Sequence, residues 1–352
     1  MTLIADRLDS FYTHGFDTVI DVRSPAEFAE DRVPGAINLP VLDNTERARV
    51  GTIYKKESPF KARKIGAALV FRNAAAHVDS ALAHHDGGWR PLIYCWRGGQ
   101  RSGAFTWMLR EIGWRAEVVE GGYRSYRRLV AKYLYETPLP HRIVQLGGFT
   151  GTAKTALLPL LSARGVQTLD LEGLASHRGS LLGDMPGGQP AQKGFESDLA
   201  QALHALDPAR PMLVEAESSR IGQITLPPML WEAMKTAPWI EIDAPIEARA
   251  RYLAEAYEDV LADQSKLREK LDPLRYHRGH ALVDSWEGLI AAGDRIALCR
   301  SLAEDHYDPA YRKSMLAQAP RVLHREKTET LDRLALETVA DRLAERFHKI
   351  RI

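Results

Sequence analysis

The sequence predicts an α/β protein of two domains, each built on a mostly parallel β-sheet, with a helical C-terminal part. The 352 residues are enough for two hydrophobic cores. Strand-like and helical segments alternate in both halves of the chain, which favours parallel sheets. The alternation breaks at "KYLYETPLPHR", residues 132–142, where two prolines indicate a linker. We therefore expect one domain at residues 1–135 and a second at 136–352.

The first half contains three predicted strands and two predicted helices. The segments "DTVIDV", "PLIYC" and "RAEVVEGG", at 17–22, 91–95 and 115–122, are typical of strands. The segment "SPAEFAEDRVPGAINLP" follows the first strand, and we expect its helix to stop before Pro34. Helical spacing from Ser102 ends at Gly113, a residue that favours the end of a helix.

The second half starts with the strand "RIVQLG" at 142–147, which leads into the segment "GFTGTAKTALLPLLSARG". Two further strands, "PMLVEAE" and "WIEIDA", lie at 211–217 and 239–244. Between them and the first strand we expect a strand in "VQTLDLE" and a helix over "QKGFESDLAQALHAL". Helical spacing dominates from Pro245 onward.

The bulk composition is that of a globular protein, with 45% hydrophobic and 26% charged residues. No apolar run approaches the roughly 18 residues of a membrane span, and the N-terminus lacks a signal-peptide pattern. Two distant cysteines form no disulfide framework. We therefore expect a cytoplasmic protein without a membrane partner. The formal net charge of +1 does not decide whether nucleic acid binds, because binding depends on local patches.

The segment "YCWRGGQRS", residues 94–102, indicates a reactive cysteine. Cys95 stands where a predicted strand hands over to a predicted helix, and two glycines let the loop between them curl. Amide groups of such a loop, together with a helix N-terminus, bind anions and lower the pKa of a nearby thiol. Arg97 and Arg101 add positive charge. We predict Cys95, Arg97 and Arg101 as catalytic residues, whereas Cys299 lies in a helical pattern and is predicted to pack in a core.

The first half resembles a rhodanese domain. The resemblance rests on "DVRSPAEFAEDRVPGAINLP" at 21–40, on the loop "CWRGGQRS" and on "VEGGY" at 119–123. It implies that Cys95 carries sulfur or selenium as a persulfide or perselenide. The C-x5-R spacing of Cys95 and Arg101 is also that of cysteine phosphatases, some of which share the rhodanese fold. Those phosphatases usually have a histidine where this chain has Tyr94, and they lack the second half.

The segment "GFTGTAKT" predicts a P-loop, and hence a P-loop NTPase-like second domain. Gly148 and Gly151 allow the loop to wrap phosphates, Lys154 reaches them, and the Thr155 hydroxyl suits a metal ion. Ala153 departs from the pattern, which has glycine there. The predicted strand before the motif and helix after it are the required context.

Acidic side chains follow two neighbouring predicted strands of the second half. Glu215 and Glu217 follow "MLV", and Asp170 and Glu172 follow "VQTL". Carboxylates and a threonine hydroxyl are oxygen ligands of the kind that Mg²⁺ prefers. We therefore predict Thr155, Glu215 and Glu217 as metal ligands, with Asp170 and Glu172 as the alternative acidic pair.

The whole chain resembles the bacterial tRNA 2-selenouridine synthases. Beyond the two loops, the resemblance rests on distinctive segments: "NTERARVGTIYK", "KIGAALV", "LDLEGLASHRGSLLG", "EAESSRIG" and "HYDPAYRKS". It implies two steps on the wobble 2-thiouridine of tRNA. A geranyl group from geranyl diphosphate is first placed on sulfur, and selenium from selenophosphate then replaces the S-geranyl group through a perselenide on Cys95. These are substrates, and no tightly bound cofactor is expected.

The same resemblance assigns further roles. The P-loop, with Gly148, Gly151, Lys154 and Thr155, suits the diphosphate of geranyl diphosphate rather than ATP, because it stabilises the departing anion. Gly66 matches a family glycine that matters for geranylation, although a glycine at a helix boundary has the same appearance.

Contact with tRNA requires basic patches with aromatic neighbours. The segment "YRSYRRLVAK" offers Arg124, Arg127, Arg128 and Lys132 directly after the strand that follows the active loop, and we predict these four as tRNA-binding. Two alternatives remain open at this stage. One is a rhodanese-fold cysteine phosphatase, and the other is a sulfur-relay module whose P-loop domain uses ATP.

Overall fold

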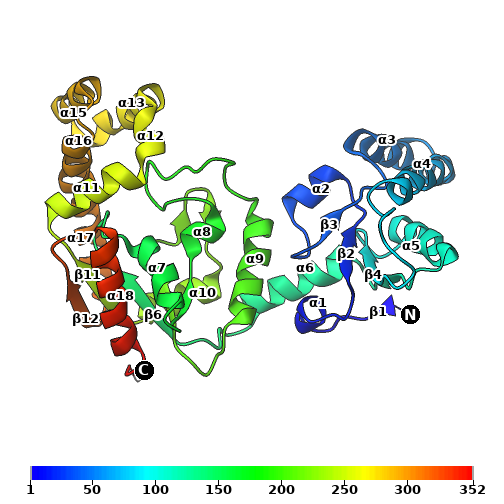
Figure 1. Cartoon of the computed structure of the whole chain (residues 1–352). Coiled ribbons are helices and arrows are strands. Elements are labelled where there is room, and N and C mark those ends of the chain that lie inside the picture. Colours follow the sequence, from blue (N-terminus) through cyan, green and yellow to red (C-terminus); the bar gives the residue numbers. More distant parts are fainter. Residues whose placement is uncertain (1, 351–352) are drawn as a thin grey trace. The chain divides into compact units, whose positions relative to one another are not determined.

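The computed structural model describes residues 2–350, with side chains for all of these except 316–318. Two compact units emerge (Figure 1). The N-terminal unit extends to Thr137 and includes Pro190–Gln201, and the C-terminal unit comprises Pro138–Gln189 and Ala202–Ile352. The sequence analysis had assigned residues 190–201 to the second domain. Their inclusion in the first unit follows from tertiary contacts, such as that of Lys193 with Glu30, which have no sequence signature.

The N-terminal unit is built on a five-stranded sheet in the order β1-β5-β4-β2-β3, with every pair parallel. In this order the strands are Thr2–Leu3, Glu117–Val119, Pro91–Tyr94, Thr18–Asp21 and Ile37–Asn38. The central β4 is buried along its whole length, as expected for a parallel strand whose two faces are covered.

Helices connect these strands. Their bounds are α1 Asp9–Tyr12, α2 Pro25–Glu30, α3 Asn44–Lys56, α4 Pro59–Asp79, α5 Gln100–Ile112 and α6 Tyr123–Ala131, followed by a π-helical segment at Lys132–Glu136. The helix predicted to run up to Pro34 stops at Glu30. The buried Arg23 guanidinium donates a hydrogen bond of 2.6 Å to the Asp31 carbonyl, and the Val33 amide donates one of 3.1 Å to the Tyr94 hydroxyl. Because these backbone groups bond to side chains, this segment cannot continue the helix.

The C-terminal unit holds a second parallel sheet in the order β12-β11-β6-β8-β7. In this order the strands are Val322–Lys327, Trp239–Asp243, Ile143–Gly147, Met212–Glu215 and Gln167–Leu169. A short antiparallel pair, β9 (Arg220–Ile221) and β10 (Ile224–Thr225), lies outside it. The edge strand β12 interrupts the region predicted to be helical. Its sequence "VLHREK" is largely polar, so it lacks an apolar strand pattern.

The helices of this unit are concentrated toward the C-terminus. Their bounds are α7 Lys154–Ser162, α8 Leu171–Ala175, α10 Pro228–Thr236, α11 Ile246–Ala256, α12 Glu258–Ala262, α13 Gln264–Leu271, α14 Arg275–Arg278, α15 His280–Ala292, α16 Arg295–Ser301, α17 Asp308–Gln318 and α18 Arg333–Phe347. Helix α9, Gln192–Ala205, belongs to the N-terminal unit up to Gln201 and to this unit from Ala202. Helices α7 and α18 contribute to one apolar core with β6 and β11. Among the described residues, no helix is both long and apolar enough to cross a bilayer.

Candidate functional site

Cys95 lies immediately after β4, in a loop held against the "EGGY" turn. The carbonyl of Cys95 accepts a hydrogen bond of 2.8 Å from the Tyr123 amide. Gly122 has a φ of 60°, and a Cβ there would stand 2.3 Å from the Cys95 carbonyl oxygen and 2.4 Å from the Gly98 nitrogen. Only glycine permits this approach, so the second glycine pair of the sequence shapes the cysteine loop.

The Cys95 thiol is buried and receives a hydrogen bond from the Ser102 hydroxyl at 3.2 Å. Burial alone would raise the pKa of Cys95. The Ser102 hydroxyl and amide, the charge of Arg101 and the Arg97 amide outweigh it and lower that pKa. In contrast, burial raises the pKa of Cys299 to about 12. Ser102 was not among the predicted site residues, although its place in the first turn of the helix after Cys95 could have indicated it.

The two predicted arginines differ in their surroundings. Arg101 forms a bidentate pair with Glu27 of α2, at 2.8 and 3.3 Å, and Arg47 of α3 lies 3.6 Å from the same carboxylate. Burial would raise the pKa of Glu27, but the hydrogen bond and charge of Arg101 hold it low, so the carboxylate stays ionised. Arg97 is exposed. Arg97 therefore remains available to an incoming anion, whereas Arg101 supports the loop through Glu27.

The aspartate and arginine of "DVR" form a support beneath the loop. Asp21 and Arg23 are fully buried and paired at 2.6 Å, and the Arg23 guanidinium stacks over the Tyr94 and Tyr123 rings at 5.6 and 4.0 Å. Arg23 thus joins the strand before Cys95 to the turn after it. This pair has a structural role that the sequence did not reveal.

The P-loop of the C-terminal unit has the expected backbone, with one strained position. Gly148 and Gly151 have φ values of 141° and 87°, and Ala153 is left-handed at 59°. A left-handed alanine costs roughly 1 kcal/mol relative to a residue in an ordinary region. The Lys154 ammonium donates to the carbonyls of Gly148 and Phe149 at 3.0 and 3.5 Å. The lysine side chain therefore packs against the loop with which it is predicted to bind phosphate.

Three residues from helices far along the chain hold the P-loop. Arg249 of α11 and Asp308 of α17 form a buried bidentate pair at 2.9 and 2.8 Å, and Arg249 also donates to the Thr150 carbonyl at 3.1 Å. The hydroxyl of Tyr311 accepts from the Gly148 amide at 2.8 Å. The segment "HYDPAYRKS" thus supplies two supports of the loop, a role that its sequence alone did not indicate.

The acidic residues predicted on two strands come together at Thr155. The Thr155 hydroxyl lies 2.8 Å from Glu172 and 3.1 Å from Glu215, and Glu215 also accepts from the Glu172 amide at 2.8 Å. Burial, reinforced by Glu172, raises the pKa of Glu217 to about 8. Burial also raises the pKa values of Glu172 and Glu215. The two predicted acidic pairs are therefore one cluster, crowded with negative charge.

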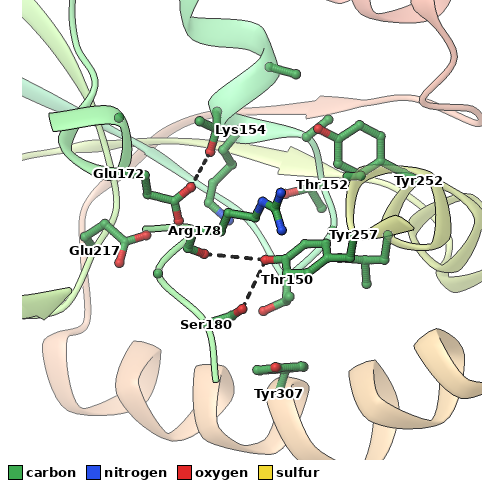
Figure 2. Close-up of a pocket in the computed structure, with 18 of the residues that line it drawn as sticks. Thr150, Thr152, Lys154, Glu172, Arg178, Ser180, Glu217, Tyr252, Tyr257 and Tyr307 are labelled. Atoms are coloured by element: carbon green, nitrogen blue, oxygen red, sulfur yellow. Dashed lines mark hydrogen bonds between the residues drawn. The ribbon is translucent and has the colours of Figure 1, made fainter. Parts of the chain in front are cut away.

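A cavity of about 530 Å³ opens beside this P-loop (Figure 2). Lys154 and Arg178 point into it from one side, and Tyr252, Tyr257 and Tyr307 line the other. The guanidinium of Arg178 lies over the Tyr257 ring at 5.0 Å, and one of its nitrogens pairs with Asp259 at 3.0 Å. Its Nη1 is buried and, among the described residues, has no hydrogen-bond partner. The cavity thus combines two cations with aromatic surface.

No ready-made metal cage accompanies these groups. Within residues 2–350, no cluster of three or more histidine, cysteine or acidic side chains has the arrangement of a metal site. The donors present, a hydroxyl and carboxylates, are nevertheless oxygen ligands, and Mg²⁺ commonly combines one or two carboxylates with oxygens of a bound phosphate. The site therefore fits an ion that arrives with a phosphate ligand.

The remaining predicted residues lie in the N-terminal unit, on two sides of the cysteine loop. Gly66 lines a cavity of about 820 Å³ bounded by α3, α4 and α5, so it is separate from the P-loop residues with which it was grouped. Arg124, Arg127 and Arg128 line a second cavity of about 620 Å³. Arg127 is paired with Glu196, and Lys132 is exposed outside the lining of this cavity.

Comparison with known proteins identifies one domain model in each half of the chain. Residues 5–129 match the rhodanese-like domain model, and residues 141–286 match the model described as tRNA 2-selenouridine synthase AAA domain. Three relatives named tRNA 2-selenouridine synthase align over most of the chain. The one from Hahella chejuensis is 33% identical over 87% of this chain and 88% of its own. Those from Chromohalobacter salexigens and Sulfurovum sp. are 37% and 32% identical, over 87% and 89% of this chain and 90% and 93% of theirs.

Proposed function

Because this chain belongs to the tRNA 2-selenouridine synthase family, we propose that it replaces the sulfur of tRNA 2-thiouridine with selenium carried on Cys95. The observation that carries the proposal is the Cys95 thiol, whose pKa is lowered although the group is buried. A surrounding that stabilises a thiolate also stabilises the terminal anion of a perselenide. The family membership sets aside the phosphatase and the ATP-driven sulfur relay considered from sequence.

We further propose that a geranyl group activates the thiouridine before selenium attacks. A thiocarbonyl is a poor electrophile, whereas its S-alkylated form can release a thiol. The P-loop cavity suits the donor, geranyl diphosphate, in two respects. Lys154 and Arg178 offer positive charge to the departing diphosphate, and the three tyrosines offer apolar surface to the prenyl chain.

Thr155 and the carboxylates of Glu172 and Glu217 would hold a Mg²⁺ ion next to that diphosphate. Glu172 takes the place of the predicted ligand Glu215 in this set, because Glu215 does not line the cavity. The ion would supply positive charge to the leaving oxygens. It would also relieve the crowding that raises the pKa values of the carboxylates. The protein's own contribution is to orient the diphosphate through loop amides that Arg249, Asp308 and Tyr311 hold in place.

A perselenide cycle on Cys95 must balance electrons, because selenium is equally reduced in selenophosphate and in the product. A small thiol satisfies this balance, because its disulfide with Cys95 oxidises the incoming selenium and the free thiol later reduces the bond between sulfur and selenium. The selenide of selenophosphate attacks a disulfide between Cys95 and the thiol, which expels the thiol, while water takes the phosphoryl group as phosphate. The terminal selenium then attacks C2, and the geranyl thiol leaves. The small thiol attacks the Cys95 sulfur, frees the selenocarbonyl and restores the disulfide.

For tRNA, we propose that phosphates bind in the cavity lined by Arg124, Arg127 and Arg128. The nearby Trp96 ring, 5.2 Å from that of Tyr123, offers a surface on which a base can stack. Arg127 already has Glu196 as a partner. We therefore expect neutralisation of Arg124 and Arg128 to reduce the salt slope of tRNA affinity more than neutralisation of Arg127 does.

The test of the proposed function is the replacement Cys95→Ser, with nucleosides of the modified tRNA analysed by mass spectrometry. Serine keeps size and polarity but removes the polarisable nucleophile. We expect S-geranyl-2-thiouridine to accumulate and 2-selenouridine to disappear. Cys299→Ser, which alters the buried cysteine of the C-terminal unit, is the matched control and should leave 2-selenouridine in place. Normal 2-selenouridine production by Cys95→Ser would contradict the carrier role.

A further inference from the structure

The cavity of about 820 Å³ beside the cysteine loop has a floor and a rim of different chemistry. Its floor is apolar and includes Val50 of α3, Gly66 and Val70 of α4, and Ala104 of α5. Its rim carries cations, among them Arg63 and the exposed Arg97. An apolar recess with a basic rim favours a hydrocarbon group attached to a polyanion.

Two neighbouring residues of the loop, Trp96 and Arg97, line both this cavity and the basic one that contains Arg124 and Arg128. Cys95 directly precedes them in the chain. A nucleotide that reaches Cys95 therefore has a cationic cavity and an apolar cavity within its reach, on a single unit of the protein. The cationic one suits phosphates, and the apolar one lacks an occupant in the function proposed so far.

We propose that the apolar cavity binds the geranyl chain of S-geranyl-2-thiouridine while Cys95 delivers selenium to C2. The inference rests on the proposed function, in which this thioether is the substrate of the selenium step. The geranyl chain is bonded to the sulfur on C2, so its first carbon lies two bonds from C2, the atom that selenium attacks. When C2 meets the selenium on Cys95, the ten-carbon chain must lie beside the cysteine loop. The cavity would thus select the alkylated nucleotide over the unmodified one.

An exposed residue in the lining of this cavity makes the inference testable. Ala67 of α4 lines the cavity and is exposed, so a larger side chain there can fill the recess without entering the core. Ala68, the next residue of the same helix, is also exposed and lies outside the lining. Ala67→Phe is therefore the blocking variant, and Ala68→Phe is its matched control.

The experiment uses the full chain, selenophosphate, a thiol and two RNA oligonucleotides, one with S-geranyl-2-thiouridine and one with S-methyl-2-thiouridine. Each buried methylene is worth about fourfold in binding, so even partial burial of the chain predicts a geranyl preference in kcat/KM of about 100-fold or more. We expect Ala67→Phe to reduce this preference about tenfold or more. Ala68→Phe should keep the preference of the unmodified protein.

The outcomes separate this inference from the function on which it rests. If the unmodified protein converts neither oligonucleotide, the proposed function fails. If it converts both equally well, or if Ala67→Phe keeps the full geranyl preference, the cavity is not the site of the chain. A third reaction, of 2-thiouridine RNA with geranyl diphosphate, tests whether the cavity instead binds the free geranyl donor. Loss of geranylation in Ala67→Phe with an intact geranyl preference in the selenium step would assign the cavity to the free donor and overturn the proposal.

Discussion

The two units each place a glycine-containing loop directly after a buried parallel strand, yet the charges around the two loops are arranged in opposite ways. At Cys95, hydrogen bonds from Ser102 and the charge of Arg101 lower the pKa of the thiol. At the P-loop, burial and mutual repulsion raise the pKa values of three carboxylates, that of Glu217 to about 8. The first site stabilises an anion of its own, whereas the second holds excess negative charge that a cation would relieve.

The difference teaches that a shared loop geometry does not determine the chemistry. Both loops depend on glycines with positive φ, at Gly98 and Gly122 in one and at Gly148 and Gly151 in the other. What differs is the side chain that the loop presents: a nucleophilic sulfur in the N-terminal unit, and a lysine with a hydroxyl in the C-terminal unit. Covalent transfer suits the first site, and stabilisation of a leaving group suits the second.

The largest expected effect comes from Lys154→Ala, which tests whether the two sites act on different leaving groups. Loss of one cation that stabilises a departing anion can cost about 100-fold in rate. We expect geranylation of 2-thiouridine RNA to fall by about that factor, while supplied S-geranylated RNA is still converted to the selenium form. The measurement is mass spectrometry of nucleosides from the two reactions, without ATP.

Lys235→Ala is the control for this comparison, because Lys235 lies in the same unit and pairs only with Glu232 among the interactions of the described residues. Its geranylation rate should match that of the unmodified protein. Geranylation that survives in Lys154→Ala, or that requires ATP hydrolysis, would show that the P-loop has another role.

A smaller effect is expected from Ser102→Ala, which removes the main hydrogen bond to the Cys95 sulfur. Hydrogen bonds to charged groups are worth about 1.5–3 kcal/mol, so the pKa of Cys95 should rise by about one unit or more. The titration then moves to higher pH, and at a pH below the pKa in both proteins the thiolate fraction falls about tenfold. The measurement is thiolate absorbance against pH, with Cys95→Ser subtracted.

Thr106→Val provides the control on the same helix. Its hydroxyl is buried and, in the part of the chain that the structure describes, has no hydrogen-bond partner. The pKa of Cys95 should be unchanged in this variant. An unchanged pKa in Ser102→Ala as well would remove the electrostatic contrast between the two sites.

A third change, Glu217→Gln, probes the excess charge at the P-loop. The pKa of Glu217, about 8, lies above its value in an unfolded chain, about 4.3. The folded state therefore holds this proton more tightly, so the contribution of Glu217 to stability is fully present below about pH 4 and is lost as the pH rises through about 8. Glutamine cannot ionise, so the decline between pH 5 and 8 should shrink by about 3.5 kcal/mol. Urea unfolding of the unmodified protein and of Glu217→Gln at pH 5 and pH 8 measures this decline. An equal decline in the two proteins would contradict the raised pKa of Glu217.

The smallest expected effect comes from Ala153→Gly, which makes the P-loop resemble the cysteine loop in its backbone. Glycine removes the left-handed strain at a φ of 59° but adds freedom to the unfolded chain. These terms oppose each other, and we expect a net gain in unfolding free energy of about 0.5 kcal/mol. The readout is the urea midpoint, and a clear loss of stability would show that the Ala153 methyl contributes packing that outweighs the strain.

Much of the architecture followed from local sequence. The strands that form β2, β4, β6, β8 and β11 were predicted because buried parallel strands are short, largely apolar segments. The end of α5 at Gly113 was predicted, since that glycine takes the left-handed conformation. The strand β12 was missed, because its edge position lets it remain polar, and α2 was predicted too long, because Arg23 and Tyr94 hold the backbone after it.

The sequence by itself determined the two α/β halves, the family, and the two loop residues for which we propose contact with an anion, Cys95 and Lys154. These depend on neighbours a few positions away, which a linear pattern records. Only the tertiary structure decided which distant side chains complete each site. It brought Glu27 to Arg101, Asp308 and Tyr311 to the P-loop, and Gly66 to the cavity beside Cys95. Such contacts arise from the packing of helices far apart in the chain, and this packing leaves no fixed spacing in the sequence.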